Sequence, residues 1–241
     1  MDTSTYIALS GQTAREHQME VLANNIANLS TPGFKGEKMM FQEFLTKPTD
    51  GSDPSSYVVS QGNARDMGQG PMTHTGNQLD VALNGSGFMT ITTPSGNQYT
   101  RNGHLALDSQ GELVTSAGFI VQGDGGSPIV IPSGAASITI GKDGTVSTDK
   151  QTVGKIAVVN FDNPQLLAET QAGLYTTTQA PQPAAGTTNV EQGTIEEANI
   201  QPVVEMTKLM DAAHQIGVAK NFADGEHTRI KNAIDRLGKT V

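Results

Sequence analysis

The feature that most constrains this 241-residue chain is a change in the spacing of its apolar residues. Near both ends, apolar and small residues recur every three or four positions, which is the spacing of a helix face. Between residues 76 and 175 they alternate with a period of two, as in strands. We therefore predict a mixed α and β protein. Its β-rich central domain, an antiparallel sandwich or barrel-like structure, is flanked by N- and C-terminal helices.

The N-terminal helix is predicted over residues 3–29, because this stretch has no Pro and its only Gly is Gly11. The sequence Ser-Thr-Pro-Gly at residues 30–33 ends it, since the residue before Pro disfavours helix and Gly favours a turn. One helix face is thin and interrupted by polar residues, so this helix needs a partner surface. That face comprises Ile7, Gly11, Ala14, Gln18, Leu22, Asn25 and Leu29.

The C-terminal helix has recognisable start signals: Asn199 as N-cap, Pro202 in the first turn and Glu205 near the positive end of the dipole. Gly217 and Gly225 leave its continuity open. Neither terminal helix has a helical neighbour in sequence, so we expect the two to pair as a coiled coil with room for further copies. The expected contact stripe comprises Val203, Met206, Met210, Ala213 and Gly217, and it resumes at Ile230, Ile234 and Leu237.

Changes in composition divide the chain into five predicted parts. Gly, Ser, Pro and Asp are frequent in residues 46–75, which also hold a short β-like stretch at Tyr57-Val58-Val59, and Thr, Gln, Pro and Ala are frequent in residues 176–194. In the β-rich part, Asp143-Gly144 between two short alternating runs predicts a hairpin. The parts are an assembly helix with its motif (1–35), an extended loop-rich connector (36–75), the β-rich domain (76–175), a linker (176–194) and a second assembly helix (195–241).

No sequence pattern supports a catalytic, cofactor or metal site. The absence of Cys excludes disulfides, thiolate zinc sites and cysteine nucleophiles. The five His residues have no spacing typical of metal ligands. The net charge of −9, from 15 Lys and Arg against 24 Asp and Glu, argues against binding of nucleic acid. An all-β hydrolase with two carboxylates brought together by loops stays open as a weaker alternative.

No apolar run is long enough to cross a membrane, and no cleavable signal peptide is visible, so we expect no membrane insertion. Residence in the cytoplasm and export by a route that removes no peptide both stay open on this evidence.

Three asparagines, Asn24, Asn25 and Asn28, crowd the end of the predicted N-terminal helix, where Asn is a poor helix former. One interpretation is fraying toward the turn. The other places Asn25 and Asn28, three residues apart on one face, in a polar contact between helices that fixes their register.

The stretch Ala-Asn-Asn-Ile-Ala-Asn-Leu-Ser-Thr-Pro-Gly-Phe-Lys, residues 23–35, resembles the N-terminal signature of the bacterial flagellar rod and hook proteins. The resemblance continues in order through residues 75–88, 99–103 and 113–118, and it returns at residues 193–199 and at Glu205-Met206. It therefore covers nearly the whole chain. Two departures affect the expected subunit contacts: Ala198 stands where the family usually has Ser, and the family's Arg-Tyr pair is absent around residues 214–219.

The resemblance implies a structural subunit of the flagellar basal-body rod, with no enzymatic activity and no cofactor. Terminal helices would form the inner tube of the proximal rod and transmit torque, with a distal-rod subunit as the alternative. The implied partners are other rod subunits and the flagellar type III export apparatus, and the implied location is the rod in the periplasmic space, reached without a cleaved signal peptide. A secreted β-sandwich binding module is the alternative from a different class.

The resemblance also implies which residues serve assembly. They lie in the two terminal motifs: Asn24, Asn25, Asn28, Thr31, Pro32, Gly33, Phe34, Lys35, Asn199, Glu205, Met206 and Met210.

Overall fold

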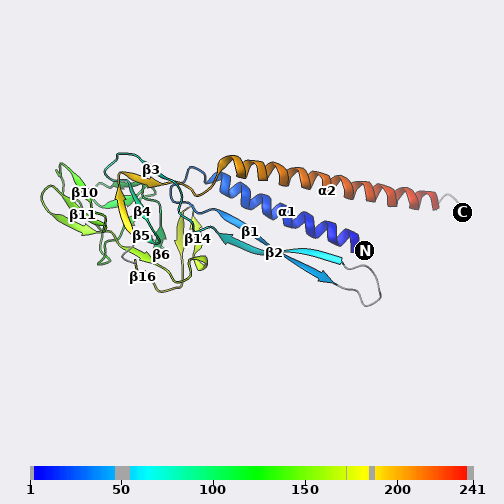
Figure 1. Cartoon of the computed structure of the whole chain (residues 1–241), viewed down its shortest axis with the longest axis horizontal. Coiled ribbons are helices and arrows are strands. Elements are labelled where there is room, and N and C mark those ends of the chain that lie inside the picture. Colours follow the sequence, from blue (N-terminus) through cyan, green and yellow to red (C-terminus); the bar gives the residue numbers. More distant parts are fainter. Residues whose placement is uncertain (1–2, 47–54, 172, 185–187, 238–241) are drawn as a thin grey trace. The chain divides into compact units, whose positions relative to one another are not determined.

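The computed structural model describes residues 3–46, 55–171, 173–184 and 188–237, and its contacts divide the chain into two compact units. The helical unit comprises residues 1–27, 37–64 and 201–241, whereas the β-rich unit comprises residues 28–36 and 65–200. The chain therefore passes from one unit to the other four times, as the sequence colours of Figure 1 allow the reader to follow.

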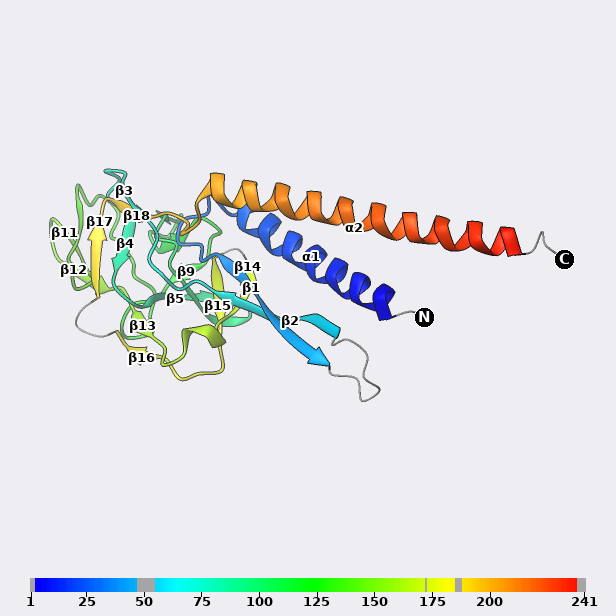
Figure 2. The ribbon, with the colours of Figure 1, turned by 45° about the vertical axis from the view of Figure 1, so that its right-hand side comes forward.

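The helical unit contains the helices α1 (Thr3–Ala27) and α2 (Pro202–Leu237) and a two-stranded sheet of β1 (Glu37–Thr46) and β2 (Ser55–Arg65). The two helices contact each other, and α1 also contacts β1. Figure 2 shows α1 beside the first part of α2. A hydrogen bond of 2.9 Å from Arg15 Nε to Gln215 Oε1 joins the two helices. The predicted pairing of the terminal helices is thus present as a contact.

Helix α1 follows the sequence prediction closely, although it ends at Ala27 rather than at residue 29. Ala14, Leu22 and Asn25 of the predicted face are buried, and Val21 is buried beside them. The side chain of Ile7 lies outside the described part of the chain.

Helix α2 is continuous through both of its glycines and begins at Pro202, with Glu205 in the first turn as predicted. The prediction that Asn199 caps this helix is wrong. Its side-chain oxygen instead accepts a hydrogen bond of 2.8 Å from the N–H of Gly36. Asx side chains bond whichever main-chain donor is near, and here that donor belongs to a segment 163 residues earlier.

The choice of contact stripe on α2 is also corrected. Val203, Met206 and Met210 are 77%, 48% and 66% exposed, and Ala213 and Gly217 are exposed too. A different stripe is shielded: Ala212 is buried, and Leu209, Ile216 and Ala219 are partly buried. Both stripes have helical spacing, so spacing alone did not distinguish them. Farther along, Ile234 is exposed, and the side chains of Ile230 and Leu237 lie outside the described residues.

The segments predicted as an extended loop-rich connector and as a linker contain strands. The connector at 36–75 holds β1, β2 and β3 (Met72–His74), and the linker at 176–194 holds β16 (Gln182–Pro183) and β17 (Asn189–Gln192). The pairing of β17 with β4 over four residues buries Val190. Composition was misleading because strand pairing uses main-chain groups, which every residue except Pro supplies in full.

The β-rich unit is built from antiparallel strand pairs. Its largest sheet runs in the open order β14-β15-β6-β5-β9-β8-β7, with β13 and β16 attached at β5. The described strands therefore form no closed barrel, although the central β-rich region is as predicted. The remaining elements are β4 (Val81–Asn84), β5 (Phe88–Thr93), β6 (Gly96–Thr100), β7 (Leu105–Leu107), β8 (Leu113–Thr115), β9 (Ile120–Val121), β10 (Ile138–Ile140), β11 (Thr145–Thr148), β12 (Thr152–Lys155), β13 (Val158–Asn160), the 3₁₀ helix η1 (Pro164–Leu166), β14 (Ala168–Gln171), β15 (Leu174–Thr176) and β18 (Thr194–Glu196).

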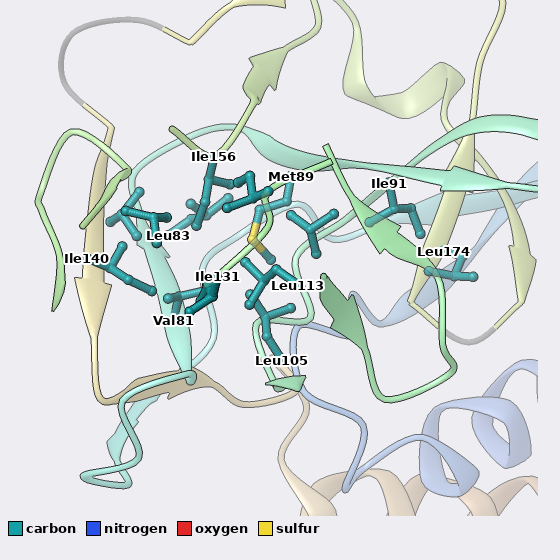
Figure 3. Close-up of a cluster of buried hydrophobic side chains, with 14 residues drawn as sticks. Val81, Leu83, Met89, Ile91, Leu105, Leu113, Ile131, Ile140, Ile156 and Leu174 are labelled. Atoms are coloured by element: carbon teal, nitrogen blue, oxygen red, sulfur yellow. The ribbon is translucent and has the colours of Figure 1, made fainter. Parts of the chain in front are cut away.

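The core of this unit is aliphatic, and Figure 3 shows Leu83, Ile131, Ile140 and Ile156 gathered around it. A second cluster is aromatic and includes Phe88, Phe161 and Tyr175. The predicted hairpin at Asp143-Gly144 is confirmed, since β10 and β11 pair on either side of it.

Two polar centres built from the terminal motifs

The first polar centre lies in the helical unit around Asn25, which is 4% exposed. Its Oδ1 accepts a hydrogen bond of 2.9 Å from the N–H of Glu37, and its Nδ2 donates one of 2.9 Å to the carbonyl oxygen of Glu37. The Asn25 amide therefore pairs with β1 as the main chain of a neighbouring strand would, and it holds the start of β1 on α1.

Asn25 also reaches the second helix. Its Nδ2 lies 3.3 Å from Oε2 of Glu205, which is 8% exposed in the first turn of α2. The other carboxylate oxygen of Glu205 accepts a hydrogen bond of 2.7 Å from Lys208 Nζ. The polar contact between helices predicted for Asn25 is thus present. Asn28 does not share it, because α1 has ended and Asn28 lies in the following turn.

The second polar centre, here called the buried charge cluster, consists of Lys35, Arg101 and Glu196 in the β-rich unit. Lys35 Nζ lies 2.6 Å from Glu196 Oε1, and Arg101 Nε lies 2.8 Å from Glu196 Oε2. The side chains are 1%, 4% and 0% exposed, respectively. The N–H of Gly70 donates a further hydrogen bond of 2.9 Å to Glu196 Oε1. One carboxylate therefore serves two buried cations.

Main-chain carbonyls accept hydrogen bonds from other donors of the cluster. Arg101 donates to the carbonyl oxygens of Leu83, Gly85 and Gly87 at 2.9 to 3.0 Å, and Lys35 Nζ donates to that of Gly68 at 2.7 Å. Such bonds offset part of the cost of removing charges from water. Burial still lowers the pKa of Lys35 below its ordinary value of 10.5; attraction to Glu196 opposes this shift and repulsion from Arg101 adds to it.

Lys35 reaches the cluster because the whole motif segment, defined as residues 28–36, is bound in the β-rich unit. The N–H of Gly33 donates to the carbonyl oxygen of Glu196 at 2.7 Å. Phe34 is 1% exposed. Gly33 has φ +70°, and a Cβ atom there would lie 2.5 Å from the carbonyl carbon of Arg101. Only glycine combines this conformation with so close a main-chain approach.

Thr31 and Pro32 shape the turn that leads into the bound part of the segment. The N–H of Thr31 donates to the carbonyl oxygen of Asn28 at 3.1 Å, and the N–H of Phe34 donates to that of Thr31 at 3.2 Å. The Thr31 hydroxyl lies 3.2 Å from Asn28 Oδ1.

Asn199 fixes the end of the motif segment. Besides accepting from the N–H of Gly36, its side chain donates to the carbonyl oxygens of Asp66 and Gly68 at 2.7 and 3.0 Å. The N–H of Asp66 in turn donates to the carbonyl oxygen of Gly36 at 2.8 Å. Asn199 therefore ties together three stretches of chain, each next to a passage between the units.

The structure thus gathers the predicted residues into two groups, one around Asn25 and Glu205 and the other around Lys35 and Asn199. Asn24, Met206 and Met210 belong to neither group and are exposed. Sequence reasoning missed Arg101 and Glu196. Both lie in stretches that carry the family resemblance, but a single charge in a short strand pattern gives no sign of being buried.

Family models match two parts of the chain. The model described as "Flagella basal body rod protein" matches residues 6–35, which cover most of α1 and of the motif segment. The model described as "Flagellar hook protein FlgE/F/G D1 domain" matches residues 82–148 in the β-rich unit.

Whole-chain relatives agree. The flagellar basal-body rod protein FlgF of Caulobacter vibrioides is 39% identical, and that of Rhizobium meliloti is 31% identical, each over 99% of both chains. The flagellar basal-body rod protein FlgG of Bacillus subtilis is 32% identical over 87% of this chain and 89% of its own. Fold, site and relatives together define a structural component of the bacterial flagellum, not an enzyme. The chain belongs to the family of flagellar basal-body rod proteins.

Membership confirms the resemblance seen in the sequence and gives the chain its role as a structural rod subunit of the flagellar basal body, with other rod components as partners. None of the helices in the described part of the chain has the length and apolarity needed to span a membrane.

Proposed function

We propose that this chain is a subunit of the proximal rod that joins neighbouring rod subunits through its two terminal helices. The observation that carries this proposal is the exposed stripe of Val203, Met206 and Met210 on α2. Contiguous apolar side chains left in water are a common mark of an interaction surface. Here they have helical spacing, which suits the face of a second helix.

The shielding of α2 supports this use. Ala212 and its partly buried neighbours are covered within the chain, while the exposed stripe lies on another side of the same helix. We infer that α1 and α2 pair as a coiled coil and that the exposed stripe contacts the terminal helices of other subunits, head to tail, in an open helical array. Torque would then pass through packed helices and β-rich units.

The first polar centre would fix the alignment of α1 relative to α2 in this arrangement. The side chain of Asn25 ties α1, β1 and α2 together, and a buried amide of this kind tolerates few alternative alignments. The motif segment and Asn199 would serve assembly less directly, by fixing where the chain enters and leaves the β-rich unit.

Placement in the proximal rather than the distal rod is supported by the FlgF relative of Caulobacter vibrioides. It is 39% identical over 99% of both chains, whereas the FlgG relative of Bacillus subtilis is 32% identical over 87% and 89%. A distal-rod subunit is the alternative.

We further propose export through the flagellar type III apparatus to the periplasmic part of the rod, with no N-terminal peptide removed. The absence of Cys is compatible with passage of an unfolded chain, since no disulfide can form on the way. Mass spectrometry of the subunit recovered from basal bodies tests this proposal, because an intact N-terminus is expected and a shortened one would contradict it.

The assembly proposal is tested by Met210→Glu, which places a charge in the exposed stripe. The variant should fold, because Met210 is exposed, yet it should be absent from basal bodies isolated from a flagellated host that lacks its own copy. Asp211→Asn is the matched control, since it also changes the helix charge by one at an exposed neighbouring position. Equal incorporation of both variants would refute the use of the stripe.

A further inference from the structure

The motif segment is bound in the β-rich unit in the way that a domain binds a peptide. Its sequence neighbours on both sides, residues 1–27 and 37–64, belong to the helical unit. Apart from the bonds of its own turn, the hydrogen bonds described above join it to Glu196, Asn199, Asp66 and Gly68 of the β-rich unit, each more than 29 residues away. Contacts with the β-rich unit, more than the covalent links to residues 27 and 37, therefore hold the motif segment in place.

The binding site, here called the segment site, recognises three chemical features. Glu196, held in place by Arg101 and Gly70, takes the ammonium group at the end of a lysine. At Gly33, two positions before this lysine, the main chain of Arg101 lies so close that only glycine fits. Main-chain groups on both sides hold the extended backbone, as in other domains that bind peptides by adding backbone hydrogen bonds.

We propose that the segment site also binds the motif segment of a second copy of this chain. A second copy carries the same Gly-Phe-Lys chemistry, which is the best available match to the site. In the intact chain, covalent attachment holds the chain's own segment at an effective concentration on the order of millimolar, so a second copy competes only when that segment is absent or impaired. This proposal is independent of the proposed helix contacts.

The test uses the full chain with its own segment impaired and the segment site unchanged. In Gly33→Val the new side chain meets the main chain of Arg101, so the chain's own segment cannot seat. A fluorescent peptide of residues 28–37 should bind this variant saturably at micromolar concentration and should not bind the wild-type chain. A Lys35→Met version of the peptide should bind on the order of 10-fold more weakly, because it lacks the ammonium group while Glu196 stays paired with Arg101.

Cross-linking locates the bound peptide, and the absence of natural Cys makes it specific. A Cβ atom at Gly173 would lie 3.8 Å from Thr31 Cγ2. A Thr31→Cys peptide should therefore form a disulfide with a Gly33→Val chain carrying Gly173→Cys. It should not do so with one carrying Ser95→Cys, which is exposed on the loop between β5 and β6.

A second acceptor keeps the test decisive if Gly33→Val does not fold. The full chain with Lys35→Met keeps a side chain of similar length, and the wild-type peptide supplies the ammonium group that this chain lacks. Saturable binding that depends on the lysine of the peptide supports the proposal. Equal binding of both peptides, disulfide formation at Ser95→Cys as fast as at Gly173→Cys, or failure of a folded acceptor to bind would overturn it.

Discussion

Replacing Glu196 by Gln removes the carboxylate that pairs with both Lys35 and Arg101 in the buried charge cluster. The neutral amide keeps the shape of the side chain but leaves two buried cations without the anion that they share. Breaking a buried ion pair from one side costs about 3–5 kcal/mol, because the remaining charge stays out of water. With a typical domain stability of about 5–15 kcal/mol, this loss would bring the β-rich unit close to unfolding at room temperature.

Lys35→Met gives the informative comparison. It removes one cation, keeps the length of the side chain, and leaves Glu196 paired with Arg101 and with the N–H of Gly70. No charge is orphaned, so we expect a cost of only about 1–2 kcal/mol. Glu197→Gln is the control, since Glu197 is the exposed neighbour on the same chain and its change should cost less than about 0.5 kcal/mol.

Urea unfolding followed by near-ultraviolet circular dichroism of tyrosine measures these costs in the β-rich unit. The chain has no Trp, and two of its four tyrosines, Tyr99 and Tyr175, lie in the aromatic cluster of that unit. The expected order of destabilisation is Glu196→Gln, then Lys35→Met, then Glu197→Gln. The reasoning fails if Lys35→Met costs more than Glu196→Gln, or if Glu196→Gln behaves like the exposed control.

Three further predictions concern single side chains. Asn25→Ala leaves two main-chain groups of β1 without their partner. It should destabilise the helical unit by about 2–3 kcal/mol in thermal unfolding followed at 222 nm, whereas Glu20→Ala at an exposed position of the same helix should cost below about 0.5 kcal/mol. The pKa of Lys35 is lower in the folded state than in the unfolded state, so between that pKa and 10.5 the unfolded chain binds more protons. The free energy of unfolding of the wild type, measured by urea titration relative to Lys35→Met, should therefore rise as pH increases through this range. A hydrogen bond from the Thr145 hydroxyl is the main cause that lowers the pKa of Asp143 below 3.8. The stabilisation that this carboxylate contributes is therefore lost as pH falls. Thr145→Val should raise this pKa toward 3.8 in an NMR titration, and an unchanged pKa would contradict the hydrogen-bond assignment.

The sequence predicted the elements whose signals are local. The change from helical spacing to a period of two located α1, α2 and the β-rich region, and Asp143-Gly144 located a hairpin. These predictions succeeded because spacing and turn residues act on the chain within a few positions.

Predictions failed where the deciding partner is distant in sequence. The role of Asn199 depends on Gly36, and burial of Glu196 depends on Lys35, so neither shows in its local sequence. The shielded stripe of α2 depends on the position of α1, which helical spacing does not encode. The strand β17 was missed because the polar composition of its segment does not prevent main-chain pairing with β4.

The separation of 161 positions between Lys35 and Glu196 has a consequence for the order of folding. If the chain is exported with its N-terminus first, Lys35 leaves the export channel long before Glu196, the carboxylate with which it pairs. Contacts between such remote positions form slowly, since a large loop must close first. In that case the ion pair of Lys35 and Glu196 can complete the β-rich unit only after about four-fifths of the polypeptide has emerged.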